Sequence, residues 1–512
     1  MMKRTLTGIA AVMVAALALT SCSSSGSSGG DAAAPAGNVP LKIGNFLDIT
    51  SWDPALADIG FDGPYLSAIY DPLVVVDGEG VPQPALATKW EVSDDFKTIT
   101  MDLRDDAVFS DGEKFDAAAA VKSLDYLKAG VRSQEAYQNV DSFEAVDTDT
   151  IAIHLKKRDD TILYFMGLGR SYMMAPKAID DGSLAKTPVG SGPYILGKDT
   201  VAGAEYHFDK VAKHWDSKDF PFDPLVISPL SDPTAMLNGM EGGQFNVIYG
   251  DQTAIDTAAA NDWNVSSGLS AWVGLQFTDR TGATEMGKPL GDVKVRQALN
   301  HAFNGPEMLK AIAQNNGAAT NQVFPDGTTG NLSKLNDLYK PSIETAKKML
   351  ADAGYADGFT VKMPMAPPFQ PYQAAVEQVF GELGIKVTWD EYQFMDYMAK
   401  APTYPVFVGV ISMDGNAVAT VERQITEPQW YNPTTSLDAF PDIKAQADKV
   451  FSADPGDAQN KEIEALNEMV TKEAWFDVWY QSNNSYVSTK EFTVTPVTGM
   501  MFPTLRHIHL EG

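Results

Sequence analysis

A single cysteine among 512 residues sets the first limit on how this chain can fold. Cys22 has no second thiol to pair with, so no disulfide can close a loop within the chain. A folded body must therefore be held together by a hydrophobic core and not by covalent cross-links. The length is sufficient for this, and it predicts roughly two to four structural units.

The same cysteine ends a segment with the pattern of an export signal. Lys3 and Arg4 give the segment a positive start, and the apolar run 9–19 is too short to span a bilayer. Residues 1–21 are therefore predicted to be a signal peptide, and Cys22 is predicted to carry lipid, as in a bacterial lipoprotein. An ordinary secretory signal followed by an incidental cysteine is the alternative.

Residues 22–39 are predicted to form a flexible linker. They are rich in Ser, Gly, Ala and Pro, a composition that cannot build a core. A coil of this kind reaches roughly 20 to 25 Å. Together with the lipid, the linker would hold the folded body at the extracytoplasmic face of a membrane, in the cell envelope.

The charge balance argues against a nucleic-acid partner. The chain has 39 Lys and Arg against 67 Asp and Glu, which gives a net charge of −28. Such a surface repels phosphate backbones and gains no attraction from anionic lipid headgroups. We therefore expect no binding of nucleic acid, and membrane attachment only through the lipid anchor.

Strand and helix periodicities alternate along the rest of the chain. Apolar residues two positions apart predict strands, and apolar residues at i, i+3, i+4 and i+7 predict amphipathic helices. Gly354 and Gly384 follow two of the helical patterns, where glycine is a typical helix stop. The alternation predicts an α/β protein. The predicted strands include 41–46, 99–103 and 385–389, and the predicted helices include 295–302, 346–353 and 372–383.

Several short blocks of sequence occur in an order that is typical of one known family. They are Asp53-Pro54, 69–74 (Ile-Tyr-Asp-Pro-Leu-Val), 84–95, 103–112, 121–124, 188–194 (Pro-Val-Gly-Ser-Gly-Pro-Tyr), 295–300 (Val-Arg-Gln-Ala-Leu-Asn) and 346–358. In this order, after a lipoprotein signal, the chain resembles the solute-binding proteins of peptide-type ABC importers, known as family 5.

The resemblance implies a periplasmic-binding-protein-like α/β fold. Two lobes with mixed sheets would be joined by hinge strands, with hinges near Ser270 and Ser488, and an extra domain would be inserted in the first lobe. A ligand that contacts both lobes would favour their closed arrangement. Mapped onto this sequence, the first lobe comprises 40–55, 186–270 and 487–512, the inserted domain 56–185, and the second lobe 271–486.

Asp414 is the first candidate ligand-binding residue. The resemblance implies that an acidic residue of the second lobe pairs with the amino group of a bound peptide, and Asp414 is the only carboxylate in the corresponding segment 407–415. It follows an apolar strand pattern, and open α/β sheets place ligands at strand ends. A solvated turn aspartate is the alternative. The Trp and Asp-Pro that the family usually has around this position are missing here, which bears on recognition of a free amino group.

Arg423 is a candidate partner for a ligand carboxylate, because a guanidinium can form two parallel hydrogen bonds to it. A surface ion pair is the alternative. Further candidates are large side chains near the edges of the predicted lobes, which could stack on a ligand, with a place in the core as the alternative. These are Trp52, Trp272, Trp479, Tyr480 and Gln481.

Other classes of function have weaker signals. Ser183 and Lys186 fit a Ser-x-x-Lys pattern, but the motifs that accompany it in penicillin-recognising enzymes are absent. His507 and His509 would lie on one face of a strand, yet a metal site needs further ligands. We therefore expect no catalytic residue, no metal and no cofactor.

The sequence thus predicts a monomeric extracytoplasmic solute-binding protein that does not transform its ligand. A peptide is the expected ligand, and an oligosaccharide, a siderophore or a metal chelate are alternatives within the same architecture. A secreted hydrolase is the alternative from another class. The expected partners are an ABC permease and its ATPase.

Overall fold

The computed structural model describes residues 39–511. The predicted signal peptide 1–21, the predicted lipidation site Cys22 and all but the last residue of the predicted linker 22–39 lie outside these residues. Within the described part, no helix combines the length and the apolar character that crossing a bilayer requires.

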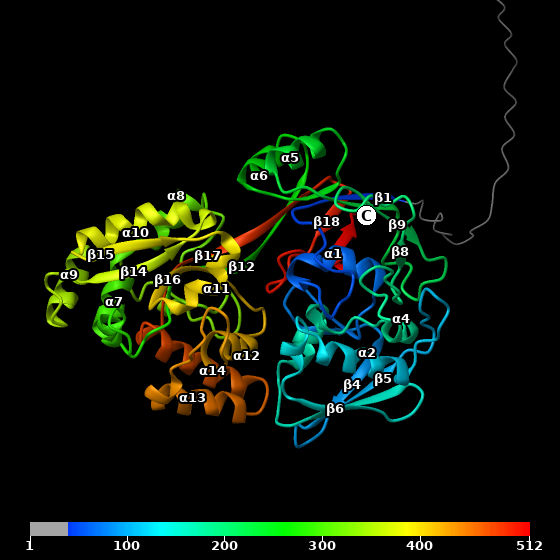
Figure 1. Ribbon diagram of the computed structural model, residues 1–512, viewed down its shortest axis with the longest axis horizontal. Coiled ribbons are helices and arrows are strands. Elements are labelled where there is room, and N and C mark those ends of the chain that lie inside the picture. Colours follow the sequence, from blue (N-terminus) through cyan, green and yellow to red (C-terminus); the bar gives the residue numbers. More distant parts are fainter. Residues whose placement is uncertain (1–38, 512) are drawn as a thin grey trace, which may run out of the picture. The chain divides into compact units, whose positions relative to one another are not determined.

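A mixed sheet of nine strands runs through the fold (Figure 1). Its order is β16-β12-β17-β11-β1-β10-β9-β8, and β13 pairs with β17 outside this path. β1 is parallel to β10 and β11, whereas β17 is antiparallel to β11, β12 and β13. The strands are β1 (Val39–Asn45), β8 (Tyr194–Leu196), β9 (Tyr206–Lys210), β10 (Phe222–Pro229), β11 (Val247–Tyr249), β12 (Asn264–Phe277), β13 (Gly317–Ala318), β16 (Val406–Ser412) and β17 (Phe476–Ser488).

Two long strands, β12 and β17, pair with each other along nearly their whole length, from Asn264 opposite Ser488 to Gln276 opposite Phe476. At one end β17 also pairs with β11, and at the other end β12 also pairs with β16. Gly274 makes this pairing possible, because a Cβ there would lie 1.9 Å from the Asp477 carbonyl oxygen. The ladder of β12 and β17 therefore joins β16 at one of its ends to β11 at the other.

Two large hydrophobic cores lie at the two ends of the β12–β17 ladder. The first core draws on residues 41–227, Val247 and residues 486–508, and the second draws on residues 272–480. A smaller cluster packs α5 (Pro233–Glu241) and α6 (Gln252–Ala258) against β11. The predicted boundaries of the two lobes and of the inserted domain stay a prediction.

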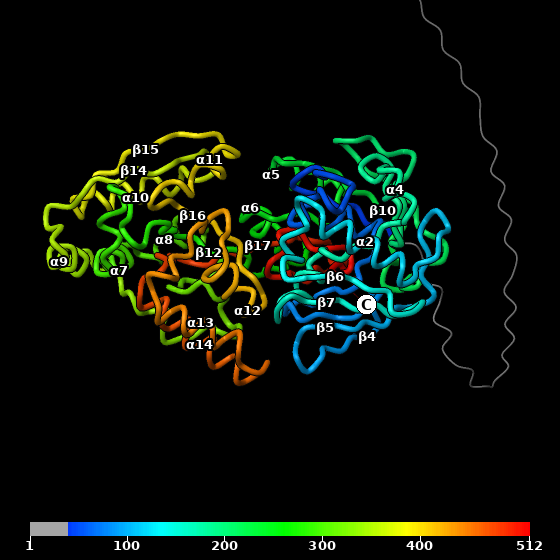
Figure 2. Tube along the Cα trace, turned by 60° about the horizontal axis from the view of Figure 1, so that its bottom comes forward, coloured from blue at the N-terminus to red at the C-terminus, as the bar shows by residue number. Residues whose placement is uncertain are grey.

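The first core includes a separate antiparallel sheet with the order β4-β5-β7-β6, which Figure 2 shows beside α2. Asp116 caps α2 by accepting a hydrogen bond from the Ala119 N–H. The predicted strand 99–103 is confirmed as β5. The further elements of this part are α1 (Ile59–Ile69), β2 (Val74–Val76), β3 (Pro82–Pro84), β4 (Ala87–Val92), β5 (Thr98–Leu103), α2 (Ala117–Ala129), β6 (Val140–Ala145), β7 (Thr150–Leu155), α3 (Ile162–Phe165), α4 (Pro176–Asp180), β18 (Phe492–Val494) and β19 (Ile508–Leu510).

The second core is mainly helical around β12, β16 and β17, with a parallel pair of strands, β14 and β15. The predicted helices 295–302, 346–353 and 372–383 are confirmed as α7, α9 and α10, and the predicted strand 385–389 as β15. The elements are α7 (Val293–Ala302), α8 (Gly305–Ile312), α9 (Ile343–Asp352), β14 (Thr360–Met365), α10 (Gln370–Glu382), β15 (Lys386–Glu391), α11 (Phe394–Lys400), α12 (Ala417–Thr420), α13 (Pro441–Ser452) and α14 (Asp457–Lys472).

A buried carboxylate joins distant segments of the first core. The Asp71 side chain is 1% exposed and lies 2.9 Å from His214 Nε2, 2.8 Å from Trp215 Nε1 and 3.1 Å from Arg506 Nη2. Burial acts to raise the pKa of Asp71, but His214, Arg506 and Trp215 outweigh it, so the pKa is lowered. Asp71 is therefore ionised in the folded protein and holds the C-terminal residues against α1 and the segment after it.

Asp71→Asn removes this charge without changing the shape of the side chain. It should lower the free energy of unfolding by about 3 kcal/mol near neutral pH, because Arg506 loses its fully buried partner and keeps only Asp216. A carboxyl with a lowered pKa contributes stability above its unfolded pKa, and this contribution is lost as the pH falls below roughly 4. Urea denaturation of the wild-type protein and of Asp71→Asn, near neutral pH and again below roughly pH 4, measures the difference in the free energy of unfolding.

Asp94→Asn is the matched control, because Asp94 is exposed. Its effect should stay within about 0.5 kcal/mol. Equal unfolding midpoints for the two variants would show that Asp71 does not hold the C-terminal residues in place.

Candidate functional site

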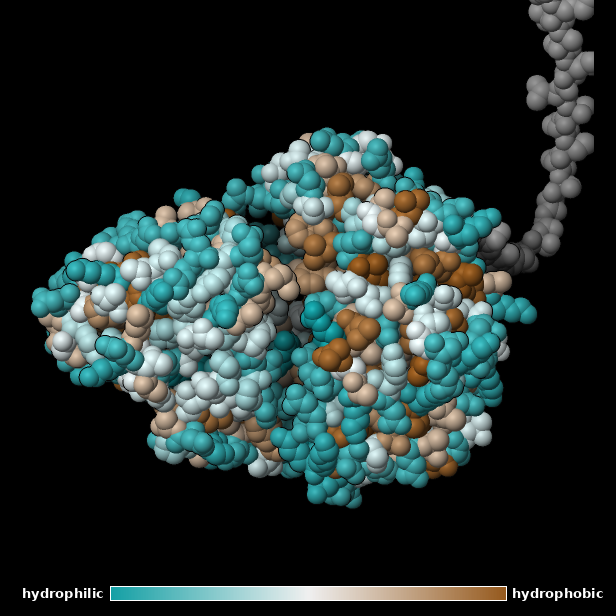
Figure 3. All heavy atoms as spheres, viewed as in Figure 1, coloured by the Kyte–Doolittle hydropathy of each residue, from teal (hydrophilic) through white to brown (hydrophobic). Residues whose placement is uncertain are grey.

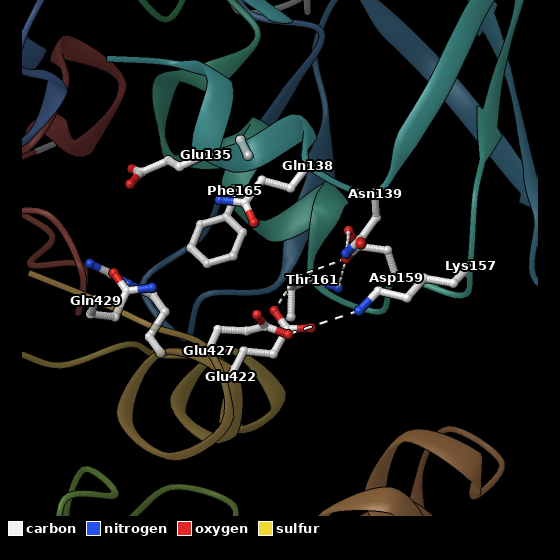
Figure 4. A pocket seen from close by; sticks show the side chains of 12 residues that line it. Glu135, Gln138, Asn139, Lys157, Asp159, Thr161, Phe165, Glu422, Glu427 and Gln429 are labelled. Atoms are coloured by element: carbon white, nitrogen blue, oxygen red, sulfur yellow. Dashed lines mark hydrogen bonds and ion pairs between the residues drawn. The ribbon is translucent and has the colours of Figure 1, made fainter. Parts of the chain in front are cut away.

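A cavity of about 210 Å³ lies between residues that belong to the two cores (Figure 4). One wall comes from η1 (Gln134–Tyr137), the residues that follow it, and the segment 157–165. The other wall comes from the π-helical turn η7 (Val421–Thr426) and residues up to Gln429. Figure 3 shows a hollow in the surface between the elements of the two cores. A ligand in the cavity would thus touch both parts.

Irregular helical turns support both walls. On one side α3 runs directly into a second π-helical turn, η2 (Met166–Arg170), where Gly169 has a φ of 86°. On the other side α12 runs directly into η7. π-helical turns are rare and occur often at functional sites, because they turn side chains away from regular helical positions.

Asp414 and Arg423 form an ion pair at the edge of the cavity. Asp414 follows β16 and is fully buried, and its Oδ1 lies 2.9 Å from Arg423 Nη1. Its Oδ2 has no hydrogen-bond partner among the described residues. Burial raises the pKa of Asp414 although Arg423 acts against it, and the charge of Asp414 raises the pKa of Arg423. Arg423 therefore presents a permanent positive charge to the cavity.

Tyr164 of α3 connects this pair to the first core. Its hydroxyl lies 3.5 Å from Asp414 Oδ1, accepts a hydrogen bond from the Gly415 N–H at 3.0 Å and donates to the Thr498 carbonyl oxygen at 3.2 Å. Its ring packs in a small apolar cluster with Ala419 of α12. One phenol thus bonds to segments from both cores, and burial raises the pKa of Tyr164, so it stays neutral.

Two further ion pairs flank the cavity. Arg170 Nη2 contacts Glu135, and the charge of Arg170 outweighs the effect of burial and lowers the pKa of Glu135. Lys157 Nζ lies 3.9 Å from Glu427 Oε1, a looser contact on the opposite side. Together with Asp414 and Arg423, these pairs give the cavity groups of both signs.

Other contacts between the walls are polar. Thr161 Oγ1 lies 2.8 Å from Glu422 Oε2, and Gln459 Nε2 donates to Asp160 Oδ2 at 2.7 Å. Burial and the charge of Asp159 raise the pKa of Glu422 to about 8. Glu422 therefore holds its proton more tightly than an ordinary glutamate, and it lies where the two walls meet.

Of the seven predicted ligand-binding residues, Arg423 lines this cavity, and Asp414 lies behind it as its buried ion-pair partner. Trp272 is buried beneath η7, and its Nε1 donates to Gln424 Oε1 at 3.1 Å. The remaining four are also packed, and none of them lines the cavity, so their contact with a ligand stays a prediction. Trp52 packs on Tyr65 and Tyr206, Trp479 on Phe303, Tyr480 Oη lies 2.8 Å from Tyr372 Oη, and Gln481 Nε2 donates to the Gln322 and Phe324 carbonyl oxygens.

Sequence reasoning missed most of the lining. Thr161, Phe165 and Glu422 carry no motif, and only the fold brings residues 161 and 422 together. The one available signal was the density of ionisable residues in the segments 157–160 and 422–427. That density fits an exposed surface equally well.

Comparison with known proteins identifies the family. Residues 81–428 match the model of the bacterial extracellular solute-binding proteins, family 5, middle region. This chain belongs to family 5. The prediction from the sequence blocks is thereby confirmed, and family 5 proteins are the extracytoplasmic solute-binding components of ABC transporters.

Individual relatives differ in what their names say they bind. Heme-binding protein A of Haemophilus influenzae is 26% identical over 369 residues, which cover 65% of this chain and 66% of that protein, just under two thirds of its length. The glutathione-binding protein GsiB of Escherichia coli K12 is 25% identical over 393 residues, which cover 74% of this chain and 72% of that protein.

A solved structure supports the fold. The periplasmic binding protein DppA of Helicobacter pylori, in complex with the peptide STSA, superposes with a TM-score of 0.75 at 19% identity, covering 93% of this chain and 98% of that one. The predicted α/β fold class of two-lobed binding proteins is confirmed.

The ion pair at the cavity of this family 5 protein leads to a prediction. Arg423→Met should leave Asp414 buried without a cation and lower the free energy of unfolding by about 3 kcal/mol near neutral pH. The unpaired carboxyl would then bind a proton with a further raised pKa. The loss should be smallest near the unfolded pKa of roughly 4 and should grow as the pH rises.

Urea denaturation of Arg423→Met and Arg423→Lys across this pH range checks the prediction. The lysine variant keeps a positive charge near Asp414 and should lose less stability. A loss for Arg423→Met that does not change with pH would contradict the role given to the buried carboxylate.

Proposed function

We propose that this chain is a lipid-anchored solute-binding protein of an ABC importer that binds a short peptide or a peptide-like zwitterion in the cavity beside Arg423. It would deliver the ligand, chemically unchanged, to an ABC permease and its ATPase. One observation carries the proposal: a cavity between residues of two cores presents both a guanidinium and carboxylates.

The polar character of the contacts between the walls supports reversible closure. The hydroxyls of Tyr164 and Thr161 and the amide of Gln459 bond across the cavity region. Such hydrogen bonds exchange with water at a small net cost, so the walls can separate. A ligand that contacts both walls stabilises the closed arrangement by its extra affinity for it.

The chemistry of the lining favours a zwitterion over the alternatives. An oligosaccharide is usually held by aromatic faces and neutral hydrogen-bonding groups. Half of the residues that line this cavity are ionisable, and its single aromatic ring is that of Phe165. An Arg423 guanidinium suits a ligand carboxylate, since the two can form parallel hydrogen bonds. An oligosaccharide, a siderophore and a metal chelate remain the competing ligand classes in a binding screen.

A thermal-shift screen of dipeptides and tripeptides with the purified protein tests this function. A true ligand at about 100 times its Kd should add about 2.7 kcal/mol to the free energy of unfolding and be recovered intact by mass spectrometry. Arg423→Lys should weaken binding roughly tenfold, because a lysine ammonium cannot form the parallel pair of hydrogen bonds. Stabilisation by sugars alone, or cleavage of the peptide, would overturn the proposal.

The anchor is tested separately. Cys22→Ala should remain in the aqueous phase of a detergent partition, or keep the uncleaved mass of the full chain, because no thiol is left to carry lipid. The wild-type protein should partition into detergent with the mass of a lipidated chain that begins at Cys22. A variant that is processed normally and still partitions into detergent would contradict lipidation at this residue.

A further inference from the structure

Two carboxylates at the cavity have no basic partner. The ion pairs described above account for Glu135, Glu427 and Asp414, each of which lies beside an arginine or a lysine. Asp159 and Glu422 have no ion-pair partner among residues 39–511. Figure 4 shows them approaching each other from opposite walls. The unbalanced charge at this point is therefore negative.

A single hydroxyl lies between these two carboxylates. Thr161 Oγ1 is 2.8 Å from Asp159 Oδ1 and 2.8 Å from Glu422 Oε2. A hydroxyl has only one proton to donate, so one of these two short contacts needs a second proton. Asp159 Oδ1 already accepts the N–H groups of Thr161 and Ile162, each at 3.0 Å. Asp159 Oδ1 is thus an acceptor in all of these contacts, and Glu422 is the group that supplies the second proton.

The surroundings of Glu422 favour the protonated form of its carboxyl group. The groups that face it are Asp159 and Lys157 from the segment before α3, and Glu427 and the Arg423–Asp414 pair from its own side. Burial and the negative charge of Asp159 raise its pKa to about 8, and the Lys157 charge only partly opposes this. At neutral pH the proton on Glu422 thus bridges the two walls through Thr161.

We propose that Asp159 and Glu422 form a subsite for a second positively charged group of the ligand, a side-chain ammonium or guanidinium distinct from the terminal ammonium of a peptide, which takes the place of this proton. The inference rests on the proposed function and narrows the ligand to a molecule with a cationic group in addition to the terminal ammonium of a peptide. Asp159 and Glu422 come from opposite walls, so a cation that contacts both holds the walls together. The displaced proton passes to the solvent.

Isothermal titration calorimetry with defined probes tests the subsite. The dipeptides glycyl-lysine and glycyl-arginine should bind roughly tenfold more tightly than glycyl-norleucine, the expected scale for a charge-assisted hydrogen bond. Near pH 7, comparison of two buffers with different ionisation enthalpies should show release of about one proton per molecule of glycyl-lysine or glycyl-arginine bound, and none for glycyl-norleucine. Near pH 9, above the pKa of Glu422, this release should disappear.

Glu422→Gln keeps the size of the side chain but cannot ionise. It should abolish both the preference for lysine over norleucine and the release of the proton, so glycyl-lysine should lose roughly tenfold more affinity than glycyl-norleucine. Glu464→Gln, on the exposed face of α14, is the matched control and should keep both properties. A structural role of Glu422 alone would weaken all three dipeptides equally, and that result overturns the subsite.

Putrescine and agmatine separate the two proposals, because they carry cationic groups but are not peptides. Binding of these two amines that is lost in Glu422→Gln, with no binding of any peptide, supports the subsite and overturns the peptide function. Equal affinities for glycyl-lysine and glycyl-norleucine overturn the subsite and leave the peptide function in place. Failure of all the cationic probes to bind overturns the subsite.

Discussion

The antiparallel pairing of β12 with β17 is the interaction on which the rest of the structure depends. At one end of this ladder β12 also pairs with β16, and at the other end β17 also pairs with β11. Buried backbone groups must be paired, so the ladder is kept along its length. Gly274 is part of this requirement, since any side chain would collide with the Asp477 carbonyl. The positions of the two cores, and of the cavity walls attached to them, follow from this pairing.

The cavity is distant from this ladder in sequence and is held by a different kind of contact. Side-chain hydroxyls and amides from residues 159–164 meet residues 414–423 and Gln459, with only a small apolar cluster around Tyr164. A large apolar interface would resist separation in water. A polar interface resists it only weakly, because water can replace its hydrogen bonds. The β12–β17 ladder keeps the two cores connected, while the polar contacts let the walls of the cavity separate. A protein that binds its ligand reversibly needs both.

Local rules were sufficient for much of the fold. Apolar periodicity located α7, α9 and α10, and glycine after the last helical residue placed the ends of α9 and α10 within about a turn. Asp414 could also be singled out from the sequence, because it is a carboxylate between an apolar strand pattern and a glycine. The order of short blocks predicted the family, and with it the fold class.

The rest of the site depends on tertiary contacts that no local pattern encodes. Thr161 and Glu422 are 261 positions apart, and the π-helical turns that direct Arg423 and Glu422 have no recognised sequence signal. Conversely, Trp272 and Trp479 are conspicuous in the sequence but are buried at the centre of the second core. Large aromatic side chains contribute so much to burial that their size alone does not distinguish a core residue from a ligand contact.

The ion pair between Asp71 and Arg506 also makes folding of the first core depend on a contact of very long range in sequence. Its two residues are 435 positions apart. Asp71 stays hydrated until the segment that carries Arg506 has docked, because no nearer arginine or lysine forms an ion pair with it among residues 39–511. Pairing over such a separation must overcome a large loss of chain entropy, which favours slow completion of this core.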